Sequence, residues 1–77
     1  MNLQQLRYII AIAESGSMNS VAKTHFIAQS SLSVAVKDLE QELGITIFTR
    51  TSKGIRVTRE GVEFLGYARQ VIEQADL

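Results

Sequence analysis

The 77-residue chain contains no cysteine, no proline and a single histidine, His25. Without cysteine there is no disulfide framework and no thiol nucleophile, and one histidine is too few for a multi-ligand zinc site. The sequence also lacks a nucleophile-base pair and a phosphate-binding glycine loop. These absences predict a protein that is not an enzyme and has no catalytic residue, no metal and no cofactor. They favour a structural role for His25.

Long hydrophobic runs are missing as well. The apolar stretches are only a few residues long, far short of a membrane span, and the start lacks the basic and apolar regions of a secretion signal. With 45% hydrophobic and 21% charged residues, the composition is that of a globular domain. We therefore expect one small cytoplasmic domain without a membrane partner. Its modest core favours association with another chain.

The formal net charge is zero, which taken alone argues against a nucleic-acid partner, because such domains are commonly basic. The charges are unevenly distributed, however. Residues 15–37 contain two cations, Lys23 and Lys37, and no acid. Residues 49–59 also contain no acid, and their cations are Arg50, Lys53, Arg56 and Arg59. The acids gather mainly between and after these two segments, so the neutral sum conceals a polarised molecule.

Helical periodicity marks three successive segments. The first follows Asn2, a favourable N-cap residue, and stops at Gly16, and the second is short and follows Ser17. The third covers about 29–43 and ends at Gly44, a residue suited to a left-handed C-terminal position. Its apolar stripe consists of Leu32, Val36, Leu39 and Leu43. The pattern predicts two helices, a turn and a third helix.

After the third helix the apolar period changes to two, over 45–50 and again over 55–58. Ser52-Lys53-Gly54 between them is typical of a hairpin turn. Thr58 is a favourable cap for a fourth helix that runs to the chain end. This order predicts a mainly α winged helix-turn-helix with a three-helix core and a two-stranded wing over 1–58, followed by a long linker or dimerisation helix over 59–77.

The third helix begins with short hydrogen-bonding side chains on its outward face. They are Gln29, Ser30, Ser31 and Ser33. Such a face allows a helix to enter the major groove of DNA, because amides and hydroxyls bond base edges or phosphates without blocking the approach. Lys37, one turn further along, reaches phosphate or guanine. Serine and glutamine are also ordinary at helix starts, so a solvated helix end stays open for this stretch alone.

The cations in the predicted hairpin region repel one another unless solvent or an anionic partner screens them. A solvated charge run is the usual explanation of such clusters. The position directly after a helix-turn-helix favours the phosphates of double-stranded DNA instead. A second alternative is a winged-helix module that binds protein through its third helix, and the basic hairpin disfavours it.

The fourth helix has a broad apolar face that satisfies two adjacent stripes rather than one. At about 1.5 Å per residue it extends about 28 Å, longer than the small body beneath it. We therefore expect a homodimer through this helix, with a twofold-related DNA target. Packing of the whole face on the first helix is the alternative. The predicted interface residues are Phe64, Leu65, Ala68, Val71, Ile72 and Ala75.

A series of short motifs extends across nearly the whole chain. They are Leu3-x-x-Leu6, Gly16-Ser17, Ala22, Gln29, Leu32-Ser33, Leu39-Glu40-x-x-Leu43-Gly44, Ile47-Phe48-x-Arg50 and Val57-Thr58-x-x-Gly61. Each motif is weak alone, but in this order and spacing they are highly specific. The chain resembles the N-terminal DNA-binding domain of LysR-type bacterial transcriptional regulators.

This resemblance implies a linker helix that leads to a C-terminal effector-binding domain, missing here because the chain stops inside the linker. A small-molecule effector then acts only through that domain. Members of the family are usually tetramers that regulate transcription from interrupted inverted repeats, and their linker helices pair two DNA-binding domains. Together with the residue pattern, the resemblance predicts DNA contacts from Gln29, Ser30, Ser31, Ser33, Val34, Lys37, Arg50, Thr51, Ser52, Lys53 and Arg56.

The chain departs from the family pattern at the start of the third helix. The family commonly has Ser-Gln-Pro where this chain has Ala28-Gln29-Ser30, so the usual cap hydroxyl is lost and we expect Ser30 or Ser31 to recap the helix. The family also often has arginine at the positions of Val34 and Ser20. These losses predict that Val34 contacts a thymine methyl group and that DNA binding depends less steeply on salt than in a more basic relative.

Overall fold

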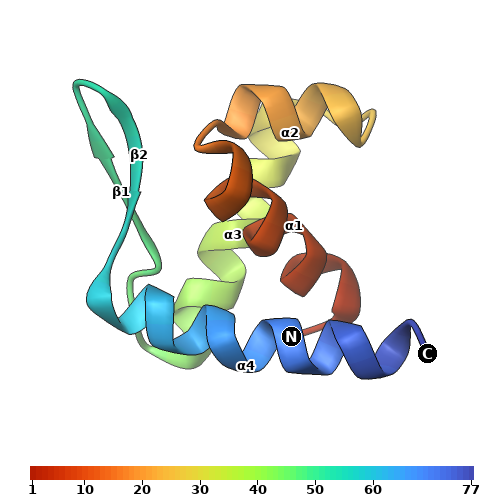
Figure 1. The fold of residues 1–77 in the computed structure, drawn as a ribbon. Coiled ribbons are helices and arrows are strands. Elements are labelled where there is room, and N and C mark those ends of the chain that lie inside the picture. Colours follow the sequence, from red (N-terminus) through yellow and green to blue (C-terminus); the bar gives the residue numbers. More distant parts are fainter.

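The computed structural model describes all 77 residues as a mainly helical body with a two-stranded wing (Figure 1). In Figure 1 the first three helices pack together, the wing projects to one side, and the fourth helix crosses beneath them. This architecture confirms the predicted winged helix-turn-helix. In chain order the elements are α1 (Leu3–Ser15), α2 (Met18–Thr24), α3 (Gln29–Leu43), β1 (Phe48–Thr51), β2 (Gly54–Val57) and α4 (Arg59–Ala75).

Three helices begin at the side-chain caps that the sequence predicts. Asn2 and Gln5 form a reciprocal capping box at the start of α1, Ser17 accepts a hydrogen bond from the backbone of Ser20, and Thr58 caps α4 through the backbone N–H of Gly61. Each cap satisfies a backbone donor that the first helical turn leaves unpaired. The capping residues therefore set where these three helices start.

The start of α3 differs from the prediction. Its N-cap residue is Ala28, which makes no side-chain cap hydrogen bond. Ser30 and Ser31 already lie inside the first turn and are exposed, so the expected recapping by either serine is wrong. The helix keeps its length because three side chains on its inner face are buried in the core. Packing thus replaces the missing cap.

One hydrophobic core joins all four helices. Its largest fully buried side chains are Ile9, Ile12, Leu32, Leu39 and Ile47. The first two come from α1 and the next two from α3, while Ile47 belongs to the segment between α3 and the wing. Leu65 and Ala68 of α4 are buried in the same cluster. The core therefore fixes α3 against α1 and also supports the base of the wing.

The wing is an antiparallel pair of strands closed by a tight turn at Ser52-Lys53. Its register pairs Phe48 with Val57, Arg50 with Ile55 and Thr51 with Gly54. The first strand begins at Phe48, three residues later than the alternating pattern from Ile45 suggests. The pattern starts too early because Ile47 enters the core and its backbone bonds a side chain of α3 instead of a neighbouring strand.

The turn between α2 and α3 is unusual at Phe26. This residue has a positive φ of 57° and is the only non-glycine residue that does, although its side chain is 93% exposed. The neighbouring His25 is half-buried, its Nδ1 lies 3.1 Å from the carbonyl oxygen of Val21, and its ring meets Tyr8 edge-on at 5.5 Å. These contacts suit the structural role expected for His25.

The end of α4 is held to α1 by an ion pair. Arg7 donates two hydrogen bonds to the Asp76 carboxylate, at 3.1 and 2.7 Å. These hydrogen bonds hold the pKa of Asp76 below its ordinary value and raise the pKa of Arg7.

None of the helices combines the length and the apolar character that a membrane span requires.

Candidate nucleic-acid interface

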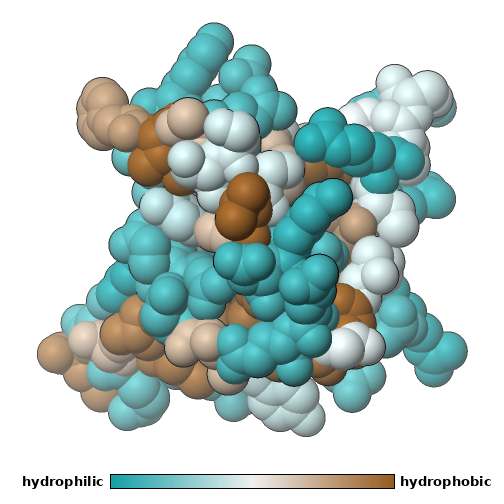
Figure 2. Space-filling view, turned by 180° about the vertical axis from the view of Figure 1, so that it is seen from behind, coloured by the Kyte–Doolittle hydropathy of each residue, from teal (hydrophilic) through white to brown (hydrophobic).

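The outward face of α3 is short and mostly polar. Gln29, Ser30 and Ser31 are exposed in its first turn, and Lys37 is exposed two turns later. Ser33 is half-buried beside the wing. Val34 is 57% exposed and is the only large apolar side chain that this face presents to solvent. Seen from behind, hydrophilic side chains cover much of the middle of the molecule (Figure 2).

The wing carries its cations on two different faces. In the observed register Arg50 lies opposite Ile55, and Arg56 lies opposite Thr49. Because side chains alternate along a strand, Arg50 and Ile55 share the face toward α3, whereas Arg56 points the other way. The structure therefore brings Arg50 together with α3 and keeps Arg56 apart from it. Lys53 is exposed in the turn at the tip.

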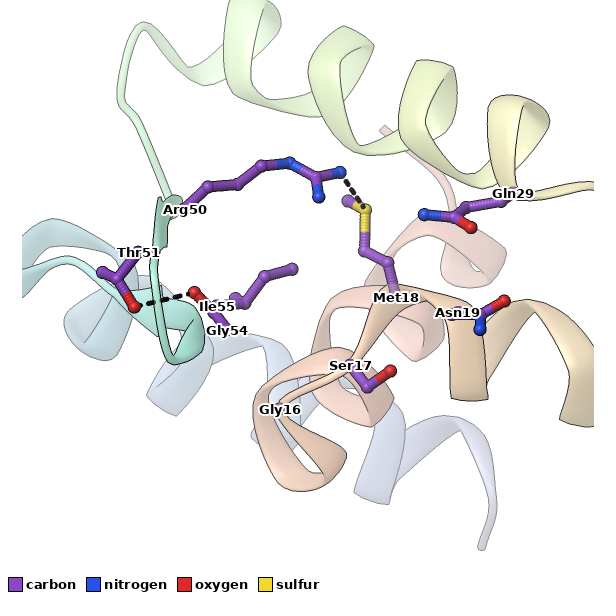
Figure 3. Close-up of a pocket in the computed structure, with 9 residues that line it drawn as sticks. All are labelled: Gly16, Ser17, Met18, Asn19, Gln29, Arg50, Thr51, Gly54 and Ile55. Carbon is purple, nitrogen blue, oxygen red and sulfur yellow. Dashed lines mark hydrogen bonds between the residues drawn. The ribbon is translucent and has the colours of Figure 1, made fainter.

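An open cavity of about 200 Å³ separates the wing from the starts of α2 and α3 (Figure 3). Arg50 extends across it from β1, and its Nη2 atom lies 3.6 Å from the sulfur of Met18. The start of α3 contributes Gln29, and the start of α2 contributes Ser17 and Asn19. Arg50 is the only charged residue in the lining. The cavity thus combines a positive charge with neutral hydrogen-bonding groups, a setting that suits an anion.

A second cleft lies between α3 and the wing, on the other side of Arg50. It is lined by Ser33, Lys37 and Glu40 from α3 and by Phe48 and Ile55 from the wing, among others. Met18 joins the two hollows, because its sulfur also lies 3.9 Å from the Ser33 hydroxyl. The predicted residues of the helix and of the wing therefore meet around one buried methionine.

Sequence reasoning missed the contribution of α2 to this surface. Ser17, Met18 and Asn19 were not predicted as site residues, yet they line the cavity beside Arg50 and Gln29. The available signal was the absence of acids over residues 15–37, which spans α2 as well as most of α3. Polar residues in that segment were candidates for the same face.

The predicted dimer interface on α4 needs correction. Leu65 and Ala68 are 2% and 1% exposed, because both pack in the core of their own chain. They are therefore unavailable to a second chain, and the prediction is wrong for these two residues. Phe64 and Ile72 are half-buried against the core. Of the predicted set, Val71 and Ala75 are exposed.

The exposed apolar surface of α4 lies beside the buried Leu65 and Ala68 and continues onto α1. Tyr67 is 61% exposed, and it lines an apolar groove of about 390 Å³ together with Leu3, Phe64 and Val71. Figure 2 shows hydrophobic side chains gathered along the lower edge of the molecule, where α4 lies. The spacing of Phe64, Tyr67 and Val71 by three and four residues was the signal for this face.

Curated relatives resemble the whole chain. The family model described as bacterial regulatory helix-turn-helix protein, lysR family, matches residues 3–62. The transcriptional regulator ClcR of Pseudomonas putida is 36% identical over 77 residues, which are 100% of this chain and 26% of ClcR. BenM of Acinetobacter baylyi is 38% identical over 76 residues, which are 99% of this chain and 25% of BenM. The chain spans about a quarter of the length of these relatives.

Solved structures agree with the sequence matches. A crystal structure of CbnR, described as a LysR family transcriptional regulator, superposes with a TM-score of 0.93 at 37% identity and covers 99% of this chain and 26% of CbnR. A crystal structure of the BenM DNA-binding domain in complex with catB site 1 DNA has a TM-score of 0.92 at 38% identity and covers 99% of this chain and 85% of that one. The chain therefore belongs to the LysR family of bacterial regulatory helix-turn-helix proteins.

Proposed function

We propose that the chain is the DNA-binding domain of a transcriptional regulator and binds double-stranded DNA in a sequence-specific manner in the bacterial cytoplasm, where that DNA lies. The observation that carries the proposal is the meeting of Arg50 with the polar start of α3 around a cavity that no acid lines. The solved DNA complexes of BenM and CbnR support it. The role is binding rather than catalysis.

In this proposal α3 lies in the major groove and reads bases with its outward face. The Gln29 carboxamide bonds adenine through both of its polar atoms, and the Ser33 hydroxyl bonds a base edge. Val34 contacts a thymine methyl group, because its exposed side chain offers only apolar atoms. Ser30, Ser31 and Lys37 bond phosphates on either side of the groove.

The wing supplies phosphate contacts in the same proposal. Its tip, formed by Thr51, Ser52 and Lys53, enters the adjacent minor groove or follows the backbone. A minor groove about 6 Å wide has a phosphate backbone on each side. The placement of Arg50 and Arg56 on opposite faces of the hairpin suits this geometry, because each then faces a different strand of the duplex.

A homodimer through α4 completes the proposal. The exposed strip of Leu3, Tyr67 and Val71 is an apolar surface that its own chain leaves open. A second copy covers it symmetrically and places two α3 helices on a twofold-related target. By family resemblance, the whole regulator forms a tetramer and a small-molecule effector acts through a C-terminal domain.

Fluorescence anisotropy with a labelled random duplex tests DNA binding. We expect log affinity to fall linearly with log salt, by about 0.9 for each phosphate that the protein neutralises. Arg50→Gln reduces the slope by about one such step. A flat salt dependence of the wild-type protein contradicts DNA binding and favours the protein-binding module. Selection of bound duplexes from a random pool then measures sequence preference.

Light scattering after size exclusion tests the dimer. We expect the wild-type chain to form dimers as its concentration rises, and Tyr67→Glu to remain monomeric because it places a charge in the apolar strip. Arg69→Gln is the matched control, because it lowers the net charge by the same one unit at an exposed position of the same helix outside the groove, and it keeps the dimer. A wild-type chain that stays monomeric at high concentration contradicts the interface.

A further inference from the structure

The segment that leads from α3 into the wing is fastened by Glu40. The carboxylate oxygen Oε2 of this α3 residue accepts hydrogen bonds from the backbone N–H groups of Ile47, at 2.6 Å, and Phe48, at 3.2 Å. Ile47 is completely buried, so its N–H group has no water to bond. Glu40 therefore joins the reading helix directly to the first residue of the wing.

The same segment is held from the other side by the start of α4. The backbone N–H of Thr58 donates to the carbonyl oxygen of Ile47 at 2.9 Å, and the Thr58 hydroxyl donates to the carbonyl of Thr46. Gly61 of α4 approaches this segment so closely that a Cβ atom added to it would lie 2.5 Å from the Ile47 carbonyl oxygen. Ile47 is thus clamped between Glu40 of α3 and the first turn of α4.

The rest of the wing has little support of its own. Neither strand contains a fully buried residue, and an isolated two-stranded hairpin is at best marginally stable in water. Arg50 lies two residues beyond Phe48 on the same face of β1. The direction in which Arg50 points therefore follows from how Phe48 is held. The Glu40 carboxylate is the polar group that holds it to α3.

We propose that Glu40 is a positioning residue for DNA binding, which fixes the angle between α3 and the wing so that both contact one duplex at once. The proposal rests on the proposed function. Glu40 lies in the cleft between α3 and the wing, where its negative charge repels phosphate. A direct contact with DNA therefore does not explain this residue. Two backbone donors to this carboxylate give it a role other than binding the nucleic acid.

Glu42 provides a matched control for the test. It lies on the same helix and its carboxylate pairs with the amino terminus. Glu40→Ala and Glu42→Ala change the net charge equally, and so do Glu40→Gln and Glu42→Gln. If the two alanine variants, or the two glutamine variants, differ in DNA binding, the difference reports the hydrogen bonds of Glu40 rather than the change in net charge.

The measurement is the salt slope of binding to a random duplex, with the full 77-residue chain. We expect Glu40→Ala to lower the slope by about one to two, which corresponds to the loss of one or two phosphate contacts at about 0.9 each. Glu40→Gln falls between it and the wild type, because the amide oxygen still accepts from Ile47. Both Glu42 variants keep the wild-type slope.

Amide hydrogen exchange separates positioning from unfolding. In the Glu40 variants we expect faster exchange at Ile47 and Phe48 while the α1 and α3 amides stay protected. If Glu40→Ala does not fold, the comparison of Glu40→Gln with Glu42→Gln decides the matter. A Glu40 variant that keeps the Glu42 slope overturns the inference and leaves the proposed function intact. A wild-type chain without salt-dependent duplex binding overturns both.

Discussion

Helix α3 and the wing are built in opposite ways. Leu32, Val36 and Leu39 anchor α3 in the core, and its outward face offers mainly neutral hydrogen-bonding groups. The wing has no fully buried residue in either strand, yet it carries three cations between Arg50 and Arg56. Base reading needs accurate placement, whereas attraction to phosphate acts over several ångströms. In the proposed function, the firmly held α3 therefore supplies specificity and the weakly held wing supplies electrostatic affinity.

Deletion of core atoms gives the largest expected difference between the two elements. Leu39→Ala removes a fully buried side chain of α3 and lowers the free energy of unfolding by about 2–5 kcal/mol. Ile55→Ala removes a half-buried side chain of the wing and costs about 1 kcal/mol. Urea denaturation followed by circular dichroism measures both. Equal losses contradict the view that the wing is the less supported element.

A methyl group at the base of the wing gives the next largest effect. Gly61→Ala places a Cβ atom 2.5 Å from the Ile47 oxygen and 2.9 Å from Val57 Cγ1, so backbone must move, at about 1–3 kcal/mol. Gly66→Ala on the same helix meets nothing within 4 Å and gains about 0.5–1 kcal/mol from helix propensity. Thermal melting compares the pair. A Gly61→Ala protein as stable as Gly66→Ala shows that the wing base tolerates displacement.

The order of elements and most of their ends were predictable because they depend on local chemistry. Caps such as Asn2 and Thr58 and the left-handed Gly16 and Gly44 act within one helical turn. The start of β1 was not predictable in this way. Ile47 fits an alternating strand by pattern. Its position is decided instead by contacts with Glu40 of α3 and with α4, both of which lie outside the predicted strand.

The candidate site shows the same limit. The cations of the wing and the polar face of α3 were visible in the sequence, but their meeting around Met18 depends on tertiary packing. The face of α4 was mispredicted for a related reason. The predicted interface includes Leu65 and omits Tyr67, but Leu65 packs in the core of its own chain and Tyr67 is exposed. Periodicity identifies an apolar face without naming its partner.

Single charges on the two elements test how affinity is divided between them. Val34→Arg adds a cation to the exposed face of α3 and steepens the salt slope by about 0.9, as expected for one further phosphate contact. Lys53→Gln removes the cation at the wing tip and makes the slope shallower by a similar amount. Anisotropy titrations across a salt series measure both changes. An unchanged slope for Val34→Arg removes that position from the interface.

The smallest expected effect concerns the turn that enters α3. Phe26 has a φ of 57°, a conformation that bulky L-residues rarely adopt and that asparagine tolerates better. Because its ring is 93% exposed, Phe26→Asn loses little packing and raises the free energy of unfolding by about 0.5–1 kcal/mol. Phe26→Val, with a β-branched side chain, shifts stability the opposite way. Thermal melting of the wild type, Phe26→Asn and Phe26→Val measures their order of stability. Equal melting temperatures for the two variants show that the turn stores no strain. If strain is relieved while the salt slope stays constant, α3 keeps its placement through its buried side chains rather than through the turn before it.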